Sequence, residues 1–441
     1  MKQHHYLITC FPLQGHINPT LQLAKNLAAL GATVTFSTAA SVLESLQPAP
    51  DGLSYASFSD ENFSLTAAYL ANLRKNGPQN LTKIIQKSLN DGRPVTCLVY
   101  SLLIPWASTV ARDMHVPSAF LAIQCAAAFA IYSRFFGGGG VESDGGGIDS
   151  SVCVKIQDLP TFSSCDLPTF VLPENAINPV MGPMMIEHMK ELETLPKPLV
   201  LLNTFQELEQ EAIEELESKL NVLAIGPLIA TSYSCGEENY MEWLDSKPKK
   251  SVVYVAFGSL MVINKEQKVE ILHGLLRSKR PFLWVVRSSD TKDKDEDEDE
   301  GMTKLVEEEM KNCDGMIVAW CSQMEVLSHK SIGCFVTHCG WNSTLEGLVC
   351  GVPMIGCPHI SDQTTNAMLV EKVWGNGVRA RANGEVVLNR EELRECLDVV
   401  MGEGERGEEI RKNALMLRGM AMEAVKDGGS SYNNLRKIML E

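Results

Sequence analysis

Short apolar runs alternate with amphipathic stretches through the first half of this 441-residue chain. A strand, a helix and a second strand are predicted at residues 5–11, 18–31 and 32–38 (HYLITCF, NPTLQLAKNLAALG and ATVTFST). The same order recurs at residues 95–101, 105–115 and 116–123 (VTCLVYS, PWASTVARDMH and VPSAFLAI). Strands that alternate with helices in this way form a parallel sheet with helices on both faces. The pattern therefore predicts an α/β fold.

The alternation stops in a polar stretch at residues 229–239 (IATSYSCGEEN) and then starts again. After it, strands and helices are predicted at residues 251–259, 265–278, 281–287, 316–321, 333–338, 342–351 and 352–358. A chain of this length also exceeds the usual size of one core, which favours two domains. We therefore predict two doubly wound domains, at residues 1–228 and 241–426, joined by a linker at 229–240. A ligand is expected in a cleft between them, at the carboxyl ends of the strands.

Composition and charge mainly exclude certain classes of binding partner. Apolar residues make up 45% and charged residues 21% of the chain, which is ordinary for a globular protein. The formal net charge is −16, so the chain is a poor candidate for binding nucleic acid or an anionic membrane. Part of this charge lies at residues 290–300 (DTKDKDEDEDE), which are predicted to form a solvated loop. A flexible loop is predicted at the glycine-rich residues 137–147.

Thirteen cysteines are scattered without a CxxC pair or a Cys/His quartet at zinc-ligand spacing. This usage predicts reduced thiols and a cytoplasmic location. The amino-terminal apolar stretch is short and bounded by Pro12, which fits a first strand better than a signal peptide. No apolar run reaches the ~18 residues of a membrane span, and the nearest one, at 118–132, is interrupted by Gln124. We expect no membrane insertion, and no sequence feature indicates an obligate protein partner.

Several common catalytic motifs do not occur in the sequence. No GxGxxG motif follows a predicted strand, and there is neither a GxxxxGK[ST] phosphate loop nor a GxSxG nucleophile motif. These observations weigh against a nicotinamide-dependent, a P-loop and an α/β-hydrolase enzyme. Asp-x-Asp pairs occur at residues 293–299, but they lie in the polar charge run and not at a strand end. We therefore expect no metal site there.

The most informative segment covers residues 333–363 (GCFVTHCGWNSTLEGLVCGVPMIGCPHISDQ). A strand leads into the turn Cys339-Gly340, and a helix is predicted to start just after it. The unpaired N–H groups of a helix start bind anions, and further donors for a diphosphate would come from His338, Asn342 and Ser343. The carboxylate and amide of Asp362-Gln363, after the next strand, are suited to binding hydroxyl groups. Together these groups suggest a sugar that carries a diphosphate.

A purely structural interpretation of this segment is a capped helix. Ser343 and Glu346 have the spacing of a capping box, in which a serine begins the helix and a glutamate bonds back to it. A capping box explains neither His338 nor the pair Asp362-Gln363. The ligand interpretation accounts for more of the segment, and the two are not exclusive.

Residues 320–363 resemble the 44-residue donor-binding signature of the plant family-1 UDP-glycosyltransferases. The W-x-x-Q start, the HCGWNS centre and the DQ end match in order and spacing. The stretches PLQGHINP, EWLDSKP and VAFGSL, at 12–19, 242–248 and 255–260, match as well, so the resemblance runs from end to end. It implies the GT-B architecture, in which two Rossmann-like domains face each other across a cleft. It also implies that a carboxy-terminal helix at about 427–441 packs back onto the first domain.

The resemblance implies a role for each donor-site residue. Trp320 would stack on the uracil, while the backbone of Cys321 and the side chain of Gln323 would bond the base and the ribose. Glu346 would accept hydrogen bonds from ribose hydroxyls. The diphosphate would be held by His338, Asn342, Ser343 and Ser259, with Gly15 and Gly340 as further donor-binding residues. The sugar would be held by Trp341, Asp362 and Gln363, and a glutamine at the last position is similar to the glucose users of the family.

Two positions depart from the family pattern. Cys321-Ser322 stands where Ala-Pro is usual, and Ile360 stands where an aromatic residue is common. The first change leaves a main-chain contact possible. The second is expected to reshape the pocket near the sugar.

The resemblance also makes His16 the base that removes the acceptor proton. A neutral imidazole suits this task because its pKa lies near neutrality. The oxygen of the acceptor would then attack the anomeric carbon in line, UDP would leave, and the configuration would invert. The structural alternative for His16 is a turn histidine bonded to backbone.

Most relatives pair this histidine with an aspartate before a Pro-Trp, and the matching stretch LVYSLLIPW places Ser101 there. A serine can orient the ring but cannot stabilise an imidazolium with a full charge. Ser101 therefore favours an acceptor that ionises easily, such as a carboxylic acid or an acidic flavonoid hydroxyl. This position is similar to the branch of anthocyanin 5-O-glucosyltransferases and glucose-ester-forming enzymes.

The sequence thus predicts an inverting, metal-independent transfer of glucose from UDP-glucose to a hydroxyl or carboxyl of a plant small molecule. UDP-glucose is a substrate, and no cofactor is expected. The alternative is a UDP-sugar-binding protein with weak or no transferase activity, because an intact donor signature with an altered catalytic pair would look the same. A sugar-nucleotide epimerase is a third possibility, which the acceptor-side GH motif disfavours.

Overall fold

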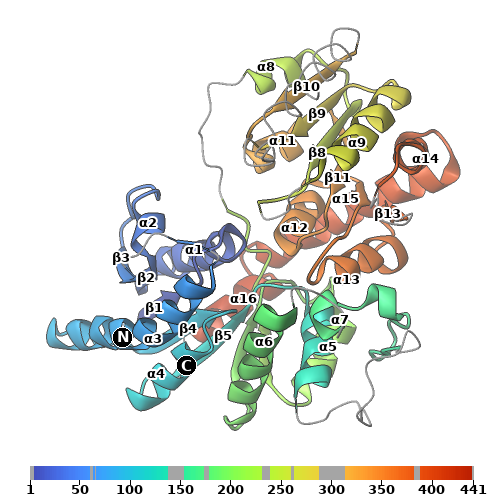
Figure 1. The fold of residues 1–441 in the computed structure, drawn as a ribbon. Helices are drawn as coiled ribbons and strands as arrows, with labels where there is room; N and C mark the ends of the chain where they lie inside the picture. Colours follow the sequence, from blue (N-terminus) through green and yellow to red (C-terminus); the bar gives the residue numbers. More distant parts are fainter. Residues whose placement is uncertain are drawn as a thin grey trace. The chain divides into compact units, whose positions relative to one another are not determined.

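The computed structural model describes most of the chain, namely residues 4–59, 63–64, 66–137, 153–172, 178–230, 239–259, 263–287, 313–381 and 388–439. The chain divides into two compact units (Figure 1). The first unit comprises residues 1–230 and 423–441, and the second comprises residues 231–422.

The first unit is built on a seven-stranded sheet with the order β3-β2-β1-β4-β5-β6-β7, in which every pairing is parallel. Its strands are β1 His5–Thr9, β2 Thr33–Ala39, β3 Leu53–Ser59, β4 Cys97–Ser101, β5 Ser118–Ala122, β6 Leu199–Leu202 and β7 Asn221–Ala224. The chain starts in the middle of the sheet, moves outward to β3, and returns across β1 to build the other half. This is the doubly wound order, and it confirms the predicted Rossmann-like fold of this half.

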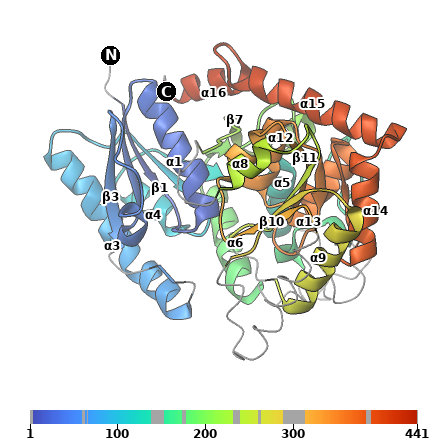
Figure 2. The ribbon, with the colours of Figure 1, turned by 90° about the horizontal axis from the view of Figure 1, so that it is seen from above.

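Helices cover both faces of this sheet. They are α1 Gln14–Ala29, α2 Ala40–Leu43, α3 Ala67–Asn90, α4 Trp106–Asp113, α5 Ala126–Phe136, α6 Asn178–Glu193, α7 Gln210–Glu217 and α16 Ser430–Ile438, with two 3₁₀ turns, η1 Ser164–Asp166 and η2 Thr169–Val171. Figure 2 shows α1 and α3 on opposite sides of the strands β1 and β3. Tyr6 of β1 donates a hydrogen bond from its hydroxyl to the carbonyl of Ile438, at 2.7 Å, so α16 is tied to the first strand.

Helix α1 starts four residues earlier than the sequence pattern predicts. The predicted helix begins at Asn18-Pro19, and proline is indeed common in the first turn of a helix. In the structure Leu13 is the extended N-cap residue, the His16 amide donates to the Leu13 carbonyl at 2.8 Å, and Pro19 lies inside the helix. His16 therefore belongs to the first turn of α1 and not to a loop before it.

The second unit repeats this topology in a six-stranded sheet with the order β10-β9-β8-β11-β12-β13, again parallel throughout. Its strands are β8 Val252–Ala256, β9 Phe282–Val285, β10 Gly315–Val318, β11 Ile332–Thr337, β12 Met354–Gly356 and β13 Gly377–Arg379. Every residue of β8 and β11 is buried, as expected for strands covered on both faces. The second Rossmann-like half predicted from the sequence is thus confirmed.

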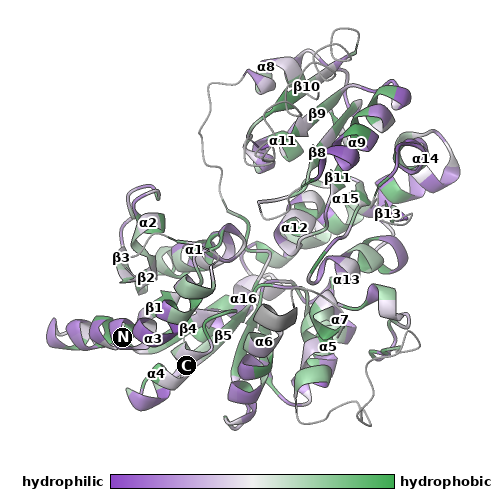
Figure 3. Ribbon diagram, in the orientation of Figure 1, coloured by the Kyte–Doolittle hydropathy of each residue, from purple (hydrophilic) through white to green (hydrophobic). Residues whose placement is uncertain are grey.

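The helices of the second unit are α8 Tyr240–Asp245, α9 Lys265–Ser278, α11 Gln323–Ser328, α12 Trp341–Cys350, α13 Gln363–Met368, α14 Arg390–Met401 and α15 Glu405–Val425, with a π-helical segment, η4 Leu369–Val373. The last three residues of α15 belong to the first unit. Helix α9 has the bounds that its apolar period predicts: the Asn264 side chain accepts from the Gln267 amide at 2.8 Å, and Lys279 ends the helix in the left-handed region. Figure 3 shows apolar strands inside this unit and hydrophilic segments on α9 and α14.

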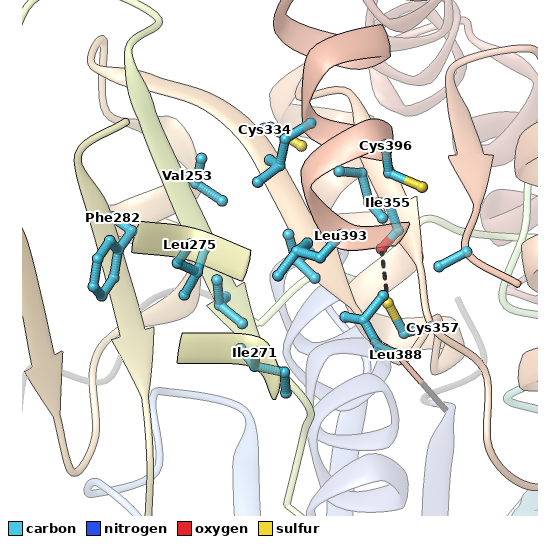
Figure 4. Close-up of a cluster of buried hydrophobic side chains, with 14 of the residues drawn as sticks. Val253, Ile271, Leu275, Phe282, Cys334, Ile355, Cys357, Leu388, Leu393 and Cys396 are labelled. Carbon is cyan, nitrogen blue, oxygen red and sulfur yellow. Dashed lines mark hydrogen bonds between the residues drawn. The ribbon is translucent and has the colours of Figure 1, made fainter. Parts of the chain in front are cut away.

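The core of the second unit lies between its sheet and the helices α9 and α14. Leu275 of α9 and Leu393 of α14 are fully buried and face Val253 and Ile355 of the sheet (Figure 4). Gly274 allows the two helices to approach closely, because a Cβ there would lie 2.9 Å from the Leu393 side chain. This packing fixes the strands whose carboxyl ends carry the donor motifs.

Several sequence predictions concern residues that the structure does not describe. The acidic run at 290–300, most of the linker at 229–240 and nearly all of the glycine-rich stretch at 137–147 lie outside the described residues. The most apolar run, at 118–132, is divided between β5 and α5. Among the described helices, none is both long and apolar enough to cross a membrane.

Candidate functional site

His16 and Ser101 meet at the point in the first sheet where the strand order reverses. Strands β1 and β4 are neighbours, with Thr9 paired to Tyr100, yet the chain leaves them toward opposite halves of the sheet. His16 follows β1 in the first turn of α1, and Ser101 is the last residue of β4. In doubly wound sheets the crevice for a ligand opens at this switch point, at the carboxyl ends of the strands.

The ring of His16 is held by uncharged groups. Its Nδ1 lies 3.5 Å from the Oγ of Ser101, which is fully buried. Burial lowers the pKa of His16 to about 3, and a backbone hydrogen bond at Leu102 offsets only part of this effect. Among the described residues, no carboxylate is bonded to the ring. His16 is therefore a neutral imidazole at pH 7, oriented but not charged by Ser101.

Aromatic rings surround this histidine. The Phe11 ring lies 5.7 Å from the His16 ring, and Phe63 meets Phe11 edge to face at 5.8 Å. Tyr69 continues the series at 5.5 Å from Phe63. Phe11 and Tyr69 are buried, whereas Phe63 is half-buried, so of these three rings it is Phe63 that offers apolar surface to a planar ligand. Gly15, beside His16, is exposed, and a Cβ there would meet nothing within 4 Å.

A second histidine, which the sequence analysis missed, lies in the same unit. His188 on α6 is 1% exposed and stacks on Tyr100 of β4 at 6.2 Å, with Phe120 of β5 at 5.2 Å. Neither ring nitrogen has a hydrogen-bond partner among the described residues. Burial lowers the pKa of His188 to about 3, with a smaller effect of His16. No motif marks this residue, since it is a single histidine in a methionine-rich helix.

The second sheet has its own switch point, between β8 and β11, where Ala256 pairs with Thr337. His338 follows β11, and its ring fits between two glycines. A Cβ at Gly258 would lie 2.6 Å from the His338 Nε2, and a Cβ at Gly340 would lie 2.4 Å from the same atom. Only glycine allows the backbone to approach this ring so closely, and Gly258 also has a φ of +73°.

Helix α12 starts directly after this turn. Gly340 is its N-cap residue, without a side-chain cap, and the Thr344 amide donates to the Gly340 carbonyl at 2.9 Å. The capping-box interpretation is therefore wrong, because Ser343 lies inside the first turn and Glu346 bonds elsewhere. Asn342 lies in the same turn and is half-buried. The first N–H groups of a helix have no intrahelical partner, which makes this start suitable for an anion.

His338 contributes a neutral ring to this anion site. Burial lowers its pKa to about 4, with further lowering by His359 and Arg287. Its Nδ1 is buried and has no partner among the described residues. The neighbouring Ser259 is exposed after β8, and its carbonyl accepts a hydrogen bond from Arg287. A neutral ring can donate one hydrogen bond to a phosphate without carrying a charge.

The loop after β10 carries the predicted nucleobase contacts. Trp320 is 44% exposed, which is unusual for a large apolar side chain and leaves a ring face available for stacking. Cys321 is buried next to it. Gln323, the first residue of α11, donates from Nε2 to the Ser343 Oγ at 2.9 Å and to the Glu346 carboxylate. The loop is thereby connected to α12.

Glu346 is 8% exposed on α12. Burial raises its pKa to about 7, and the hydrogen bond from Gln323 opposes this shift. The carboxyl group is thus close to half ionised at neutral pH. A ligand with hydroxyl donors would stabilise the ionised form, because hydrogen bonds to a carboxylate favour its charge.

Asp362 and Gln363 begin α13 after β12. The Gln363 Oε1 accepts from the amides of His359 and Ile360, at 2.9 and 3.1 Å, and so shapes the loop before it. Asn366 donates to the Asp362 carboxylate at 3.1 Å and to the Cys339 carbonyl at 2.8 Å. Burial raises the pKa of Asp362. The Cys339 turn and the Asp362 carboxylate are therefore held together by one amide.

The indole of Trp341 is buried against a second tryptophan. It is 4% exposed and lies 6.1 Å from the ring of Trp374. A contact of Trp341 with a sugar would therefore be made by its main chain, at the start of α12.

The carboxyl edge of the second sheet thus combines an exposed aromatic ring, a buried carboxyl group, an anion-binding helix start and a carboxylate-amide pair. This set suits a base, a ribose, a diphosphate and a sugar in turn. In the described part of the chain, no group of three or more His, Cys, Asp or Glu side chains could hold a metal ion. The Asp-x-Asp pairs at 293–299 lie outside the described residues.

Comparisons with known proteins agree with this arrangement. Residues 217–420 match the family described as UDP-glucoronosyl and UDP-glucosyl transferase. A chloroplastic crocetin glucosyltransferase from Gardenia jasminoides is 42% identical over 100% of this chain and 97% of its own. An anthocyanidin 3-O-glucoside 5-O-glucosyltransferase from Perilla frutescens is 39% identical over 100% and 99%. The crystal structure of Os79 from O. sativa with UDP matches with a TM-score of 0.86 at 33% identity, covering 99% of both chains.

Proposed function

This chain belongs to the plant family-1 UDP-glycosyltransferases, and we propose that it transfers glucose from UDP-glucose to a plant small molecule with inversion and without a metal ion. The observation that supports this most strongly is the carboxyl edge of the second sheet. There Trp320 follows β10 and the glycine-flanked His338 follows β11, while Glu346 lies on α12 and accepts a hydrogen bond from Gln323 of the loop after β10.

On the donor side, each group of UDP-glucose has a matching protein group. The uracil would stack on Trp320, with Cys321 and Gln323 bonding the base and ribose. Glu346 would accept from the ribose hydroxyls. The diphosphate would lie at the start of α12, where N–H groups and the His338 ring donate. Ser259, Gly340, Asn342, Ser343 and Gly15 would complete the donor contacts, and glucose would be bonded by Asp362, Gln363 and the main chain of Trp341.

On the acceptor side, His16 would accept the proton of the attacking group. An oxygen of the acceptor would form a bond to the anomeric carbon as the bond to the UDP oxygen breaks, and the negative charge would pass to the diphosphate. Attack from the face opposite the leaving group inverts the anomeric carbon. The helix start and His338 would stabilise the diphosphate as this charge develops.

The surroundings of His16 support an acceptor that ionises easily. A ring with a pKa of about 3 is a weak base, and Ser101 adds no charge. A carboxylic acid is already ionised at pH 7, whereas a phenol with a pKa near ~10 is not. The half-buried ring of Phe63, which packs on Phe11 beside His16, favours a planar apolar body. We therefore propose an aromatic or polyene carboxylic acid, or an acidic flavonoid or anthocyanin hydroxyl.

An assay with purified protein, UDP-glucose and EDTA tests this function. Transfer should continue when divalent metal is chelated, and NMR of the product should show the β-anomer formed from the α-linked donor. A strict metal requirement, or retention of configuration, would contradict the proposal.

One observation favours the alternative of a UDP-sugar-binding protein with weak activity, namely that His16 has no charged partner among the described residues. Tight UDP-glucose binding without transfer to any acceptor would support that alternative.

We also propose that the enzyme works in the cytoplasm on small molecules, without a nucleic-acid, membrane or obligate protein partner. None of the cysteines in the described part of the chain forms a disulfide, which agrees with a reducing compartment. One relative is named as chloroplastic. Fluorescence imaging of the tagged full-length chain in plant cells would distinguish the two locations.

A further inference from the structure

Two buried tyrosines hold the loop that carries the nucleobase contacts. Tyr254, in the middle of β8, donates from its hydroxyl to the Gln323 Oε1 at 3.2 Å and lies 3.3 Å from the Cys321 Sγ. Tyr240, the first residue of α8, accepts a hydrogen bond from the Ser322 amide at 3.2 Å. The three consecutive residues 321–323 are thus each bonded to a tyrosine hydroxyl. Neither tyrosine was singled out in the sequence, and neither has a role in the function proposed above.

The Tyr254 hydroxyl determines how the Gln323 amide is oriented. A glutamine side chain has one acceptor oxygen and two N–H donors. Here the oxygen accepts from Tyr254, while the NH₂ group donates to Ser343 and to Glu346. Reversing the amide would bring its oxygen against the Glu346 carboxylate, which is also an acceptor. The bonds to Glu346 and Tyr254 together therefore keep the donors of Gln323 on the side of α12.

The position of Tyr254 is itself fixed by packing. The residue is 1% exposed, and its ring stacks on Phe335 of the neighbouring strand β11, with centroids 5.0 Å apart and planes 18° apart. Burial raises the pKa of Tyr254 well above its usual value, so the hydroxyl remains protonated and able to donate at any assay pH. A rigid donor on a central strand can orient a loop residue without touching the ligand.

Tyr240 restrains the neighbouring residue through the backbone. Ser322 is 4% exposed and has a φ of −74°, so its amide would be a buried donor without the Tyr240 oxygen. A proline at this position would have no N–H to donate. The hydrogen bond to the Tyr240 hydroxyl therefore requires a backbone N–H at position 322, which serine has and proline would lack.

We propose that Tyr254 and Tyr240 are positioning residues for the nucleoside part of UDP-glucose. They hold residues 321–323 so that Gln323 and Glu346 face the base and the ribose together. This inference rests on the donor site proposed above. It gives neither tyrosine a direct contact with the ligand. Tyr254 acts through Gln323, and Tyr240 acts through the backbone of Ser322.

The variants Tyr254→Phe and Tyr240→Phe test this proposal because each removes one oxygen and keeps the ring. Tyr6→Phe is the matched control, since it also removes a buried hydroxyl with a hydrogen bond, but from the first unit. Calorimetric titration with UDP should show affinity lowered about fivefold to tenfold in Tyr254→Phe, as expected for one lost hydrogen bond. A smaller loss is expected in Tyr240→Phe, and none in Tyr6→Phe.

Titration with 2′-deoxy-UDP separates positioning from general damage. If Tyr254 orients the groups that bond the ribose, the fold-loss on Tyr254→Phe should be clearly smaller for 2′-deoxy-UDP than for UDP. In turnover, the variant should raise KM for UDP-glucose while kcat changes less than about twofold. Unchanged UDP affinity, or equal losses for both nucleotides, would overturn the inference. Failure of the wild-type protein to bind UDP would instead contradict the proposed function.

Discussion

His16 carries the acceptor-side proposal at the scale of single residues. Its position after β1 and its distance from Ser101 follow from two short motifs that are 85 residues apart in the sequence. The depressed pKa of its ring does not follow from them, because it depends on burial by residues from several elements. Sequence reasoning therefore identified the pair of residues but not the electrostatic state of the base.

The pH dependence of transfer reports this state directly. With a folded pKa of about 3, His16 stays neutral down to about pH 5, whereas an ordinary histidine would be largely protonated there. At saturating UDP-glucose, kcat/KM for a phenol acceptor, which needs the neutral ring as its base, should therefore stay level between pH 8 and about pH 5. A fall with an inflection near pH 6.5 would show a solvated histidine and contradict the geometry around Ser101.

Replacing Ser101 by aspartate should change acceptor preference. A carboxylate beside Nδ1 favours the imidazolium and so raises the pKa of His16, which makes it a stronger base. Transfer to a phenol should increase about tenfold relative to transfer to a carboxylic acid, measured as the ratio of kcat/KM values. Ser101→Asn is the control of matched shape without charge and should leave this ratio unchanged. An equal effect of both variants would show that the charge at position 101 does not cause the change in acceptor preference.

Glu346 should make UDP binding depend on pH. Its folded pKa of about 7 lies above the usual value of 4.5, so the carboxylate becomes dominant only as the pH rises above 7. Ribose hydroxyls donate to the ionised form, so UDP should bind up to about tenfold more tightly at pH 8 than at pH 6. Titration calorimetry of wild type and Glu346→Gln separates this effect from ionisation of the UDP diphosphate, which affects binding to both proteins equally. Equal pH slopes would contradict the role of Glu346.

At the scale of elements, periodicity and turn residues predicted the framework well. The helix α9 and the strands that carry the motifs lie where apolar runs placed them, because each run is bounded by polar residues or glycine. The start of α1, predicted at residue 18, lies at Gln14. The bonds from Tyr254 and Tyr240 have no local signal, since each joins residues more than 60 positions apart.

The glycine turn around His338 gives a prediction at this scale. Gly258→Ala would place a Cβ 2.6 Å from the His338 Nε2, at a φ that is strained for alanine. The ring or the turn must move, so affinity for UDP should fall by more than tenfold. Gly419→Ala is the control, because a Cβ at that position in α15 meets nothing within 4 Å. It should leave UDP affinity unchanged and stabilise the helix by about 0.5–1 kcal/mol, measured by chemical denaturation.

At the scale of the whole molecule, the repeated βαβ pattern was enough to predict two Rossmann-like units. Both sheets start at a central strand and reverse at a switch point, which places the GH motif in one unit and the HCGWNS motif in the other at equivalent edges. The acceptor is the part that the sequence could not predict. Loops have no hydrophobic period that restricts their residues, and an isolated residue such as His188, whose pKa is lowered by burial and in smaller part by His16, belongs to no motif.

The central claim is that this enzyme glucosylates an acceptor that ionises without a strong base. Its most direct test is a competition experiment in which purified enzyme, UDP-glucose and EDTA are mixed with equal amounts of an aromatic carboxylic acid and a phenol of similar shape. Mass spectrometry before and after mild alkaline treatment would separate labile glucose esters from stable glycosides. The account predicts that the base-labile ester forms faster. Faster formation of the stable phenol glucoside would contradict it.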